Sequence, residues 1–135
     1  MIDSFSGPYR WLSNFWTALV VLDGVTYPTV EHAYQAAKTL DLAARAGFTA
    51  GSAGEAKRLG RTVTIRPDWD AVKLSVMEDL VRQKFSDSSL RALLLATAPH
   101  ELVEGNWWGD RFWGVCKGSG ENHLGKILMR VRDHA

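Results

Sequence analysis

Apolar residues recur every three or four positions along much of this chain, which is the spacing of amphipathic helices. The longest such stretch predicts a helix over residues 68–85, with an apolar stripe that includes Val72 and Val76. A second strong pattern predicts a closing helix over residues 122–132. Shorter helices are predicted over residues 29–40, 41–46, 52–59 and 89–96.

A β-hairpin is predicted before the first of these helices. The β-branched run from Thr17 to Leu22 is followed by Asp23-Gly24 and then by Val25 to Tyr27. Asp-Gly between two strand-like segments favours a two-residue turn, because both turn residues need positive φ angles. Thr29 then supplies a side-chain oxygen that can cap the following helix.

Two segments show neither the helical nor the strand-like periodicity of apolar residues. Residues 1–15 mix turn residues with aromatic ones, which predicts a folded loop. Residues 105–125 hold six of the 12 glycines and three of the six tryptophans, so this segment is too rich in glycine for regular structure and too aromatic for a linker. A short strand is predicted over residues 100–104. The whole pattern predicts one α+β domain over residues 1–135, mostly helical, with a small antiparallel sheet.

Composition agrees with an ordinary globular domain: 46% of the 135 residues are hydrophobic and 23% are charged. Cys116 is the single cysteine, so no internal disulfide forms, and the four histidines are scattered rather than paired as zinc ligands are. We therefore expect a reducing, cytoplasmic location and neither a metal nor a cofactor. Apolar runs reach only five residues, so no membrane span is expected.

Net charge narrows the class of ligand. Sixteen basic residues against 15 acidic ones give a net charge of +1, which argues against binding of long nucleic acid through charge alone. A small phosphorylated ligand remains compatible with this balance, and Arg61 and Arg66 are candidates to receive its phosphate. Oligomeric state is not determined by these patterns.

The predicted helix over residues 29–40 carries the best chemical constellation. Glu31, Tyr34, Gln35 and Lys38 have the spacing i, i+3, i+4 and i+7, so they share one face. Such a row is typical of a solvated helix face, but a carboxylate near a helix N-terminus is also well placed for proton transfer. The neighbouring His32 is expected to be structural.

Several motifs in the chain resemble those of the NADAR family. They are Ser13-Asn14-Phe15, the run PTVEHAYQAAK at 28–38, Gly60-Arg61 with Trp69, LLLATAP at 93–99, Phe112-Trp113-Gly114, and Gly120 through Gly125 with its Asn122. The matches extend in order from Phe5 to Arg132. The resemblance implies an α+β, largely helical fold and hydrolysis of an N-glycosidic bond between ribose and a base or amine.

The resemblance also implies which residues form the site. The expected catalytic residues are Glu31, Lys38 and Asp110, and the expected substrate-binding residues are Ser13, Asn14, Phe15, Gln35, Arg61, Trp69, Trp113 and Asn122. Glu31 takes the place of the family's essential glutamate. Lys38 either helps to orient the ribose or attacks C1′ to form a transient imine.

Two substrate classes are consistent with the resemblance: riboflavin-pathway intermediates that bear a phosphoribosyl amine, and ADP-ribosyl-guanine in nucleic acid. The segment NWWGD at 106–110 contains a second Trp-Gly, at Trp108, whose role the motifs leave open. Trp107 or Trp108 could stack on a neighbouring base of a nucleic acid. The alternative function is a non-catalytic module that binds ADP-ribose or a nucleotide in the same pocket.

Overall fold

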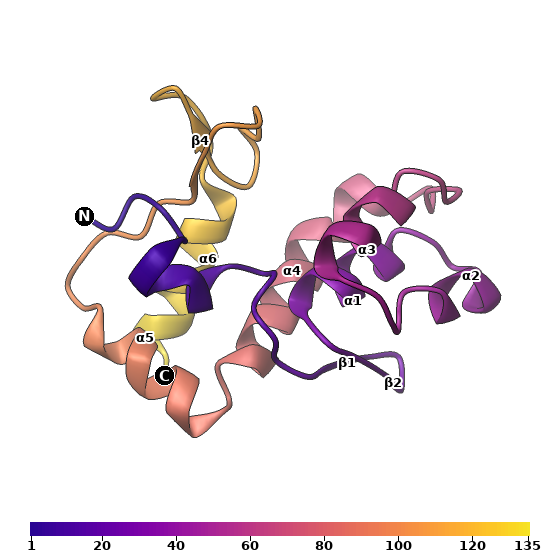
Figure 1. Ribbon diagram of the computed structural model, residues 1–135, viewed down its shortest axis with the longest axis horizontal. Helices are drawn as coiled ribbons and strands as arrows, with labels where there is room; N and C mark the ends of the chain where they lie inside the picture. Colours follow the sequence, from indigo (N-terminus) through magenta and orange to yellow (C-terminus); the bar gives the residue numbers. More distant parts are fainter. The chain divides into compact units, whose positions relative to one another are not determined.

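The computed structural model describes residues 1–135, whose contacts form two compact units (Figure 1). The central unit is Asn14–Lys84, and the terminal unit combines Met1–Ser13 with Phe85–Ala135. Helices dominate both units and strands are short, so the predicted α+β class is confirmed. The prediction of one domain over residues 1–135 stays a prediction. None of the helices combines the length and the apolar character that crossing a membrane requires.

The predicted hairpin is present in the central unit. Strands β1 (Val20–Leu22) and β2 (Val25–Tyr27) pair antiparallel, with Val20 opposite Tyr27. The turn residues Asp23 and Gly24 have φ angles of 48° and 81°, as the Asp-Gly signal requires. Val20 and Tyr27 are buried, so one end of the hairpin packs into the core of this unit.

Helix α1 (Val30–Ala37) forms the core of the central unit, and all eight of its residues are buried. It contacts both strands of the hairpin, α2 (Leu42–Ala46), α3 (Ala53–Leu59) and α4 (Trp69–Lys84) (Figure 1). The Thr29 hydroxyl accepts a hydrogen bond from the backbone N–H of His32 at 3.1 Å, which is the predicted cap. The helix ends at Ala37, three residues before the predicted end, with Lys38 as its C-cap.

Two side chains, one from α4 and one from α2, connect the hairpin to these helices. Gln83 of α4 pairs with the edge of β1, accepting from the backbone N–H of Val21 at 2.7 Å and donating to its carbonyl at 2.8 Å. Arg45 of α2 is buried and donates to Asp23 in the turn at 2.6 Å and to the Thr39 carbonyl at 2.8 Å. These bonds connect the hairpin next to α1 to both α2 and α4.

The terminal unit differs from the prediction in three places. The expected loop at residues 1–15 contains the 3₁₀ helix η1 (Gly7–Leu12). The expected strand at residues 100–104 is wrong, because only Leu102 forms a bridge, to Ile2, and no further pairing extends it. The glycine-rich segment contains a two-residue parallel pair, β3 (Gly105–Asn106) and β4 (Val115–Cys116). Helices α5 (Ser88–Ala96) and α6 (His123–Asp133) match their predictions to within one residue.

Buried polar side chains hold α6 to the segments around it. Asn122 precedes the helix with a φ of 53°, accepts from the Glu104 N–H at 2.9 Å and donates to the Leu102 carbonyl at 3.0 Å. Arg132, near the other end, donates to the Thr97 hydroxyl at 3.0 Å. Asn122 thereby satisfies backbone groups of Leu102 and Glu104 in the segment before β3.

Candidate active site

The polar row on α1 is buried rather than solvated. Glu31, Tyr34 and Gln35 are only 8%, 7% and 4% exposed, and Lys38 is half-buried. The interpretation of this row as a solvated face is therefore wrong. Burial follows from the packing of α3 and α4 against α1, which a single-helix pattern does not report. Buried polar groups of this kind need partners or a function.

The Glu31 carboxylate lies in the first turn of α1 and is held by its neighbours. Gln35 Nε2 donates a hydrogen bond to Glu31 Oε2 at 2.8 Å. Burial raises the pKa of Glu31, while the Gln35 hydrogen bond and then the charges of Lys57 and Lys38 oppose that rise. A raised pKa brings a carboxyl group closer to neutrality, where it can exchange protons with water or a leaving group.

The Lys38 ammonium shows the opposite shift. Burial lowers its pKa, the charge of Glu31 opposes this, and the charges of Arg61 and Lys57 lower it further. Its Nζ lies 5.7 Å from the centre of the Tyr34 ring. Lys38 is thus both a cation beside a buried carboxylate and an amine that loses its proton more easily than an exposed lysine does.

Two aromatic rings pack against each other near Lys38. The ring of Tyr34 lies 5.2 Å from that of Trp69, tilted by 52°. Trp69 begins α4 and is 8% exposed, so most of its surface is already packed. The predicted stacking of Trp69 on a base would therefore use only the small remaining exposed part of the ring.

The motif at residues 13–15 divides between the two units. Asn14 lies beside α1, since its carbonyl accepts from the Glu31 N–H at 3.1 Å. Phe15 is 46% exposed. Ser13 ends η1 and belongs to the terminal unit. The structure thus brings Asn14 close to Glu31 through the main chain.

The two candidate phosphate-binding arginines differ in their surroundings. Arg66 forms a two-pronged ion pair with Asp68, at 2.6 and 3.0 Å, which uses the donors that a phosphate would need. Its backbone N–H donates to the Lys38 carbonyl at 2.7 Å. Arg61 is exposed and acts electrostatically on Lys38. Of the two, Arg61 is the better candidate.

Asp110, Trp113 and Asn122 belong to the terminal unit. One Asp110 oxygen accepts from the backbone N–H groups of Phe112 at 3.1 Å and Trp113 at 2.9 Å, so the carboxylate shapes its own loop. Both polar side-chain atoms of Asn122 bond to backbone groups. Their catalytic and binding roles stay predictions, to which the structure adds a local structural role.

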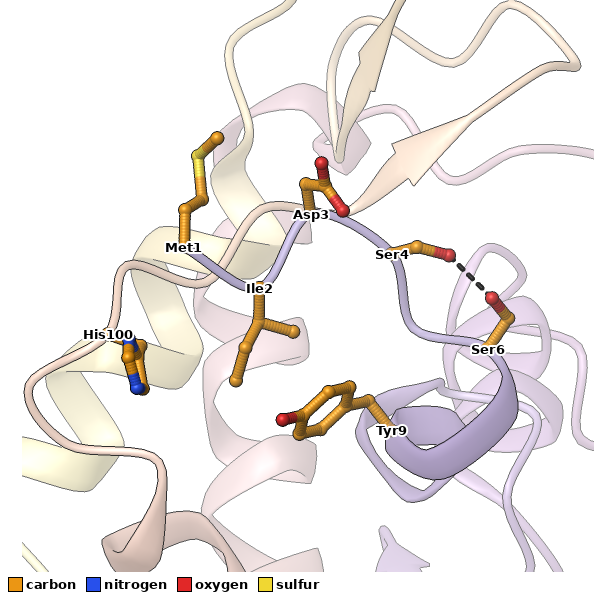
Figure 2. Close-up of a pocket in the computed structure, with 7 residues that line it drawn as sticks. All are labelled: Met1, Ile2, Asp3, Ser4, Ser6, Tyr9 and His100. Carbon is orange, nitrogen blue, oxygen red and sulfur yellow. Dashed lines mark hydrogen bonds between the residues drawn. The ribbon is translucent and has the colours of Figure 1, made fainter.

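A separate pocket of about 250 Å³ lies in the terminal unit (Figure 2). Residues 1–4 with Ser6, Tyr9 and His100 line it, and the hydroxyls of Ser4 and Ser6 bond to each other at 2.6 Å across its rim. No residue predicted for the active site lines this pocket. We therefore place the candidate site around α1, where Glu31 and Lys38, two ionisable groups of opposite charge, both have pKa values shifted by burial.

Sequence reasoning left two contributors out of the site. Tyr34 was part of the row on the helix, but its packing on Trp69 has no sequence signal. Lys57, in the last turn of α3, stabilises the ionised form of Glu31, which becomes visible only when α3 is packed on α1. His32 is structural as expected, with its ring nitrogens bonded to the Thr29 hydroxyl and the Gly51 carbonyl at 2.7 and 3.0 Å.

Comparisons with known proteins match nearly the whole chain. The NADAR domain family model matches residues 3–134. N-glycosidase YbiA of Escherichia coli is 42% identical, over 96% of this chain and 84% of that protein. An N-glycosidase of Nostoc punctiforme is 40% identical, over 93% of this chain and 85% of that protein. The NMR structure of E. coli YbiA superposes with a TM-score of 0.85 at 40% identity, covering 99% of this chain and 86% of that one.

The identity of 42% and 40% to these two N-glycosidases, over more than nine-tenths of the chain, defines the chain, by class, as an N-glycosidase. The chain belongs to the NADAR family. A riboflavin biosynthesis protein of Vibrio vulnificus is also similar, at 38% identity over 93% of this chain but only 35% of that longer protein. The resemblance noted from the motifs is thereby confirmed.

Proposed function

We propose that this protein hydrolyses the N-glycosidic bond between a ribose and an amine in a small phosphorylated substrate, of the kind formed in riboflavin biosynthesis. The observation that carries the proposal is the Glu31 carboxylate, buried on α1 and held by Gln35 with Lys38 and Lys57 close enough to act on its charge. The names of two relatives, an N-glycosidase and a riboflavin biosynthesis protein, support this substrate class.

The reaction needs positive charge to be stabilised at C1′ and water to be delivered there. As the C1′–N bond breaks, its electron pair goes to the departing amine, and an oxocarbenium-like sugar forms. The ionised Glu31 stabilises that cation and takes a proton from the attacking water. The departing nitrogen gains the proton that the water loses, so the products are the free amine and a ribose with a hydroxyl at C1′.

Cationic groups beside Glu31 suit the remainder of such a substrate. Arg61 is exposed and carries donors for a phosphate. We assign to Lys38 and Gln35 the role of orienting the ribose hydroxyls. In this proposal Asp110 is the second acid or base, and Trp69 and Trp113 contact the base. Asn14, Phe15, Ser13 and Asn122 complete the proposed binding residues.

The proposal is tested by incubating the purified protein with both substrate classes. We expect release of free amine and of ribose phosphate, in equal amounts, from phosphoribosylamine intermediates. Chromatography with mass detection follows both products. Release of base from ADP-ribosyl-guanine alone would move the assignment to the second class. Release from neither, with retained binding, would support the alternative of a non-catalytic nucleotide-binding module.

ADP-ribosylated nucleic acid is a second candidate substrate because of one exposed feature. Trp107 is 85% exposed and Trp108 is 48% exposed, with their rings at right angles and 5.6 Å apart. Asn106 pins the loop by bonding to both the N–H and the carbonyl of Asp110, at 3.0 and 2.8 Å. An indole displayed by a loop with such internal hydrogen bonds can stack on a neighbouring base.

Replacement of Trp108 with alanine separates the two substrates. We expect Trp108→Ala, and likewise Trp107→Ala, to change turnover of a small phosphoribosylamine by less than about twofold, since a small molecule has no neighbouring base to stack. Steady-state rates with each substrate provide the measurement. A loss confined to ADP-ribosylated oligonucleotides would instead assign the loop to strand binding and favour the second candidate.

A further inference from the structure

Gly60 occupies a position where its backbone conformation does not explain the choice of glycine. It caps the C-terminus of α3 with φ of −60° and ψ of −20°, the ordinary right-handed helical region. Any L-amino acid adopts these angles, and alanine favours them more than glycine does. Glycine at a helix end usually serves a left-handed conformation, which is absent here. Another constraint therefore accounts for Gly60.

That constraint is the side chain of Gln35 on α1. A Cβ atom built on Gly60 would overlap Gln35 Oε1, and would lie 2.8 Å from Gln35 Cδ and 3.3 Å from its Cβ. The carboxamide therefore packs directly onto the Gly60 backbone. Gln35 is 4% exposed and α1 is enclosed by its neighbours, so the side chain has little room to move aside.

The packed carboxamide holds the Glu31 carboxylate. Gln35 Nε2 donates to Glu31 Oε2 at 2.8 Å, whereas Gln35 Oε1, on the Gly60 side, is buried without a hydrogen-bond partner. This orientation of the amide directs its donor toward the ionised carboxylate. Packing against the Gly60 backbone leaves this oxygen without a hydrogen-bond partner. The same packing determines that the NH₂ group of the amide, rather than its oxygen, faces Glu31.

We propose that Gly60 is a positioning residue for the reaction, whose missing side chain lets α3 press against Gln35 and so fixes the Glu31 carboxylate at C1′ of the substrate. The inference rests on the proposed function, because it assigns Glu31 the role argued above. Gly60 itself touches neither substrate nor water in this scheme. It acts through Gln35.

A methyl group at position 60 changes Glu31 in a defined direction. The overlap forces the Gln35 carboxamide out of its present position despite the little room around it, and Glu31 then loses the hydrogen bond that favours its ionised form. The pKa of Glu31 therefore rises further, and the acidic limb of the pH–rate profile moves to higher pH. Because the carboxylate also loses its fixed position, we expect kcat to fall about 10- to 100-fold with little change in KM.

The matched control lies on the same helix. Gly54 is also a glycine in α3, but a Cβ there would meet only Arg58 Nη1 and Ser52 Oγ, both at 3.8 Å, which is ordinary contact. We expect Gly54→Ala to keep the kcat, KM and pH profile of the unmodified enzyme. An equal loss of kcat in Gly54→Ala and Gly60→Ala would overturn the inference, since any perturbation of α3 would then explain it.

A double-mutant cycle tests whether Gly60 acts through Gln35. In a Gln35→Ala background the carboxamide is absent, so adding Gly60→Ala should change kcat by less than about twofold. A further loss of tenfold or more in that background would show that Gly60 acts by another route and would overturn the inference. The cycle also remains informative if Gly60→Ala alone folds poorly, because truncating Gln35 makes room for the methyl group.

A measurement without substrate separates this inference from the proposed function. Carbon-detected NMR titration reports the pKa of the Glu31 carboxyl directly, and we expect a higher value in Gly60→Ala than in the unmodified and Gly54→Ala proteins. An unchanged Glu31 pKa would refute the positioning role. A raised pKa in a protein that releases no amine from any substrate would uphold the contact and reject the proposed function.

Discussion

Replacing Glu31 with glutamine is expected to reduce amine release by about 100- to 10,000-fold, the range that a general acid–base group contributes. The glutamine has nearly the same shape and still accepts a hydrogen bond from Gln35, so binding of the substrate should change little. Single-turnover rates and calorimetric titration measure the two quantities separately. Glu101→Gln, at an exposed glutamate of the terminal unit, is the control that should keep full activity.

Stability should move in the opposite direction in the same variant. Burial raises the pKa of Glu31 in the folded protein, so the folded state holds this proton more tightly than the unfolded chain does. The resulting contribution to stability is complete below the unfolded pKa and is lost as pH rises through the folded pKa. At neutral pH Glu31→Gln should therefore have a higher Tm than the unmodified protein, and the difference should shrink on acidification.

These outcomes also distinguish an enzyme from a non-catalytic binding module. A non-catalytic binding module would release no amine in either protein and would keep its affinity in Glu31→Gln. A Tm that falls at neutral pH would mean that the carboxylate is needed for folding rather than placed for chemistry. Loss of turnover together with a raised Tm is the combination expected of a catalytic carboxylate whose burial lowers the stability of the fold.

The second large effect is expected at Lys38. If its ammonium charge orients the substrate, Lys38→Met should lose about 100-fold in kcat/KM while Lys38→Arg retains most of the rate. Burial lowers the pKa of Lys38, so the rate of the unmodified enzyme should fall as pH rises through that lowered pKa. The arginine keeps its proton, and its alkaline limb should therefore move to higher pH.

Borohydride distinguishes this role from covalent catalysis. An attacking Lys38 amine would displace the leaving amine at C1′ and form an imine with the opened sugar, which borohydride reduces to a stable adduct. With direct hydrolysis at Glu31 we expect no mass increase on the Lys38 peptide during turnover. An adduct there, together with an inactive Lys38→Arg, would establish the imine route instead.

Local signals determined most of the secondary structure. Thr29, Asp41, Ser52 and Asp87 each cap the helix that follows them, and the Asp-Gly turn forms the hairpin. These features depend on side chains and backbone within a few residues of one another, so a sequence reports them directly. Where pairing is distant, as between Ile2 and Leu102, the sequence offered only an alternation that resembled a strand.

The sequence by itself determined the family, the helices and the row of Glu31, Gln35 and Lys38 on one helix face. Only the tertiary structure decided that this row is buried, because α3 and α4 cover α1 and remove its carboxylate from water. Only the packing of α3 on α1 shows that the Gln35 carboxamide lies directly against the Gly60 backbone. Helical spacing specifies which side chains share a face, whereas the pKa of each depends on the solvent and charges that other elements exclude or supply.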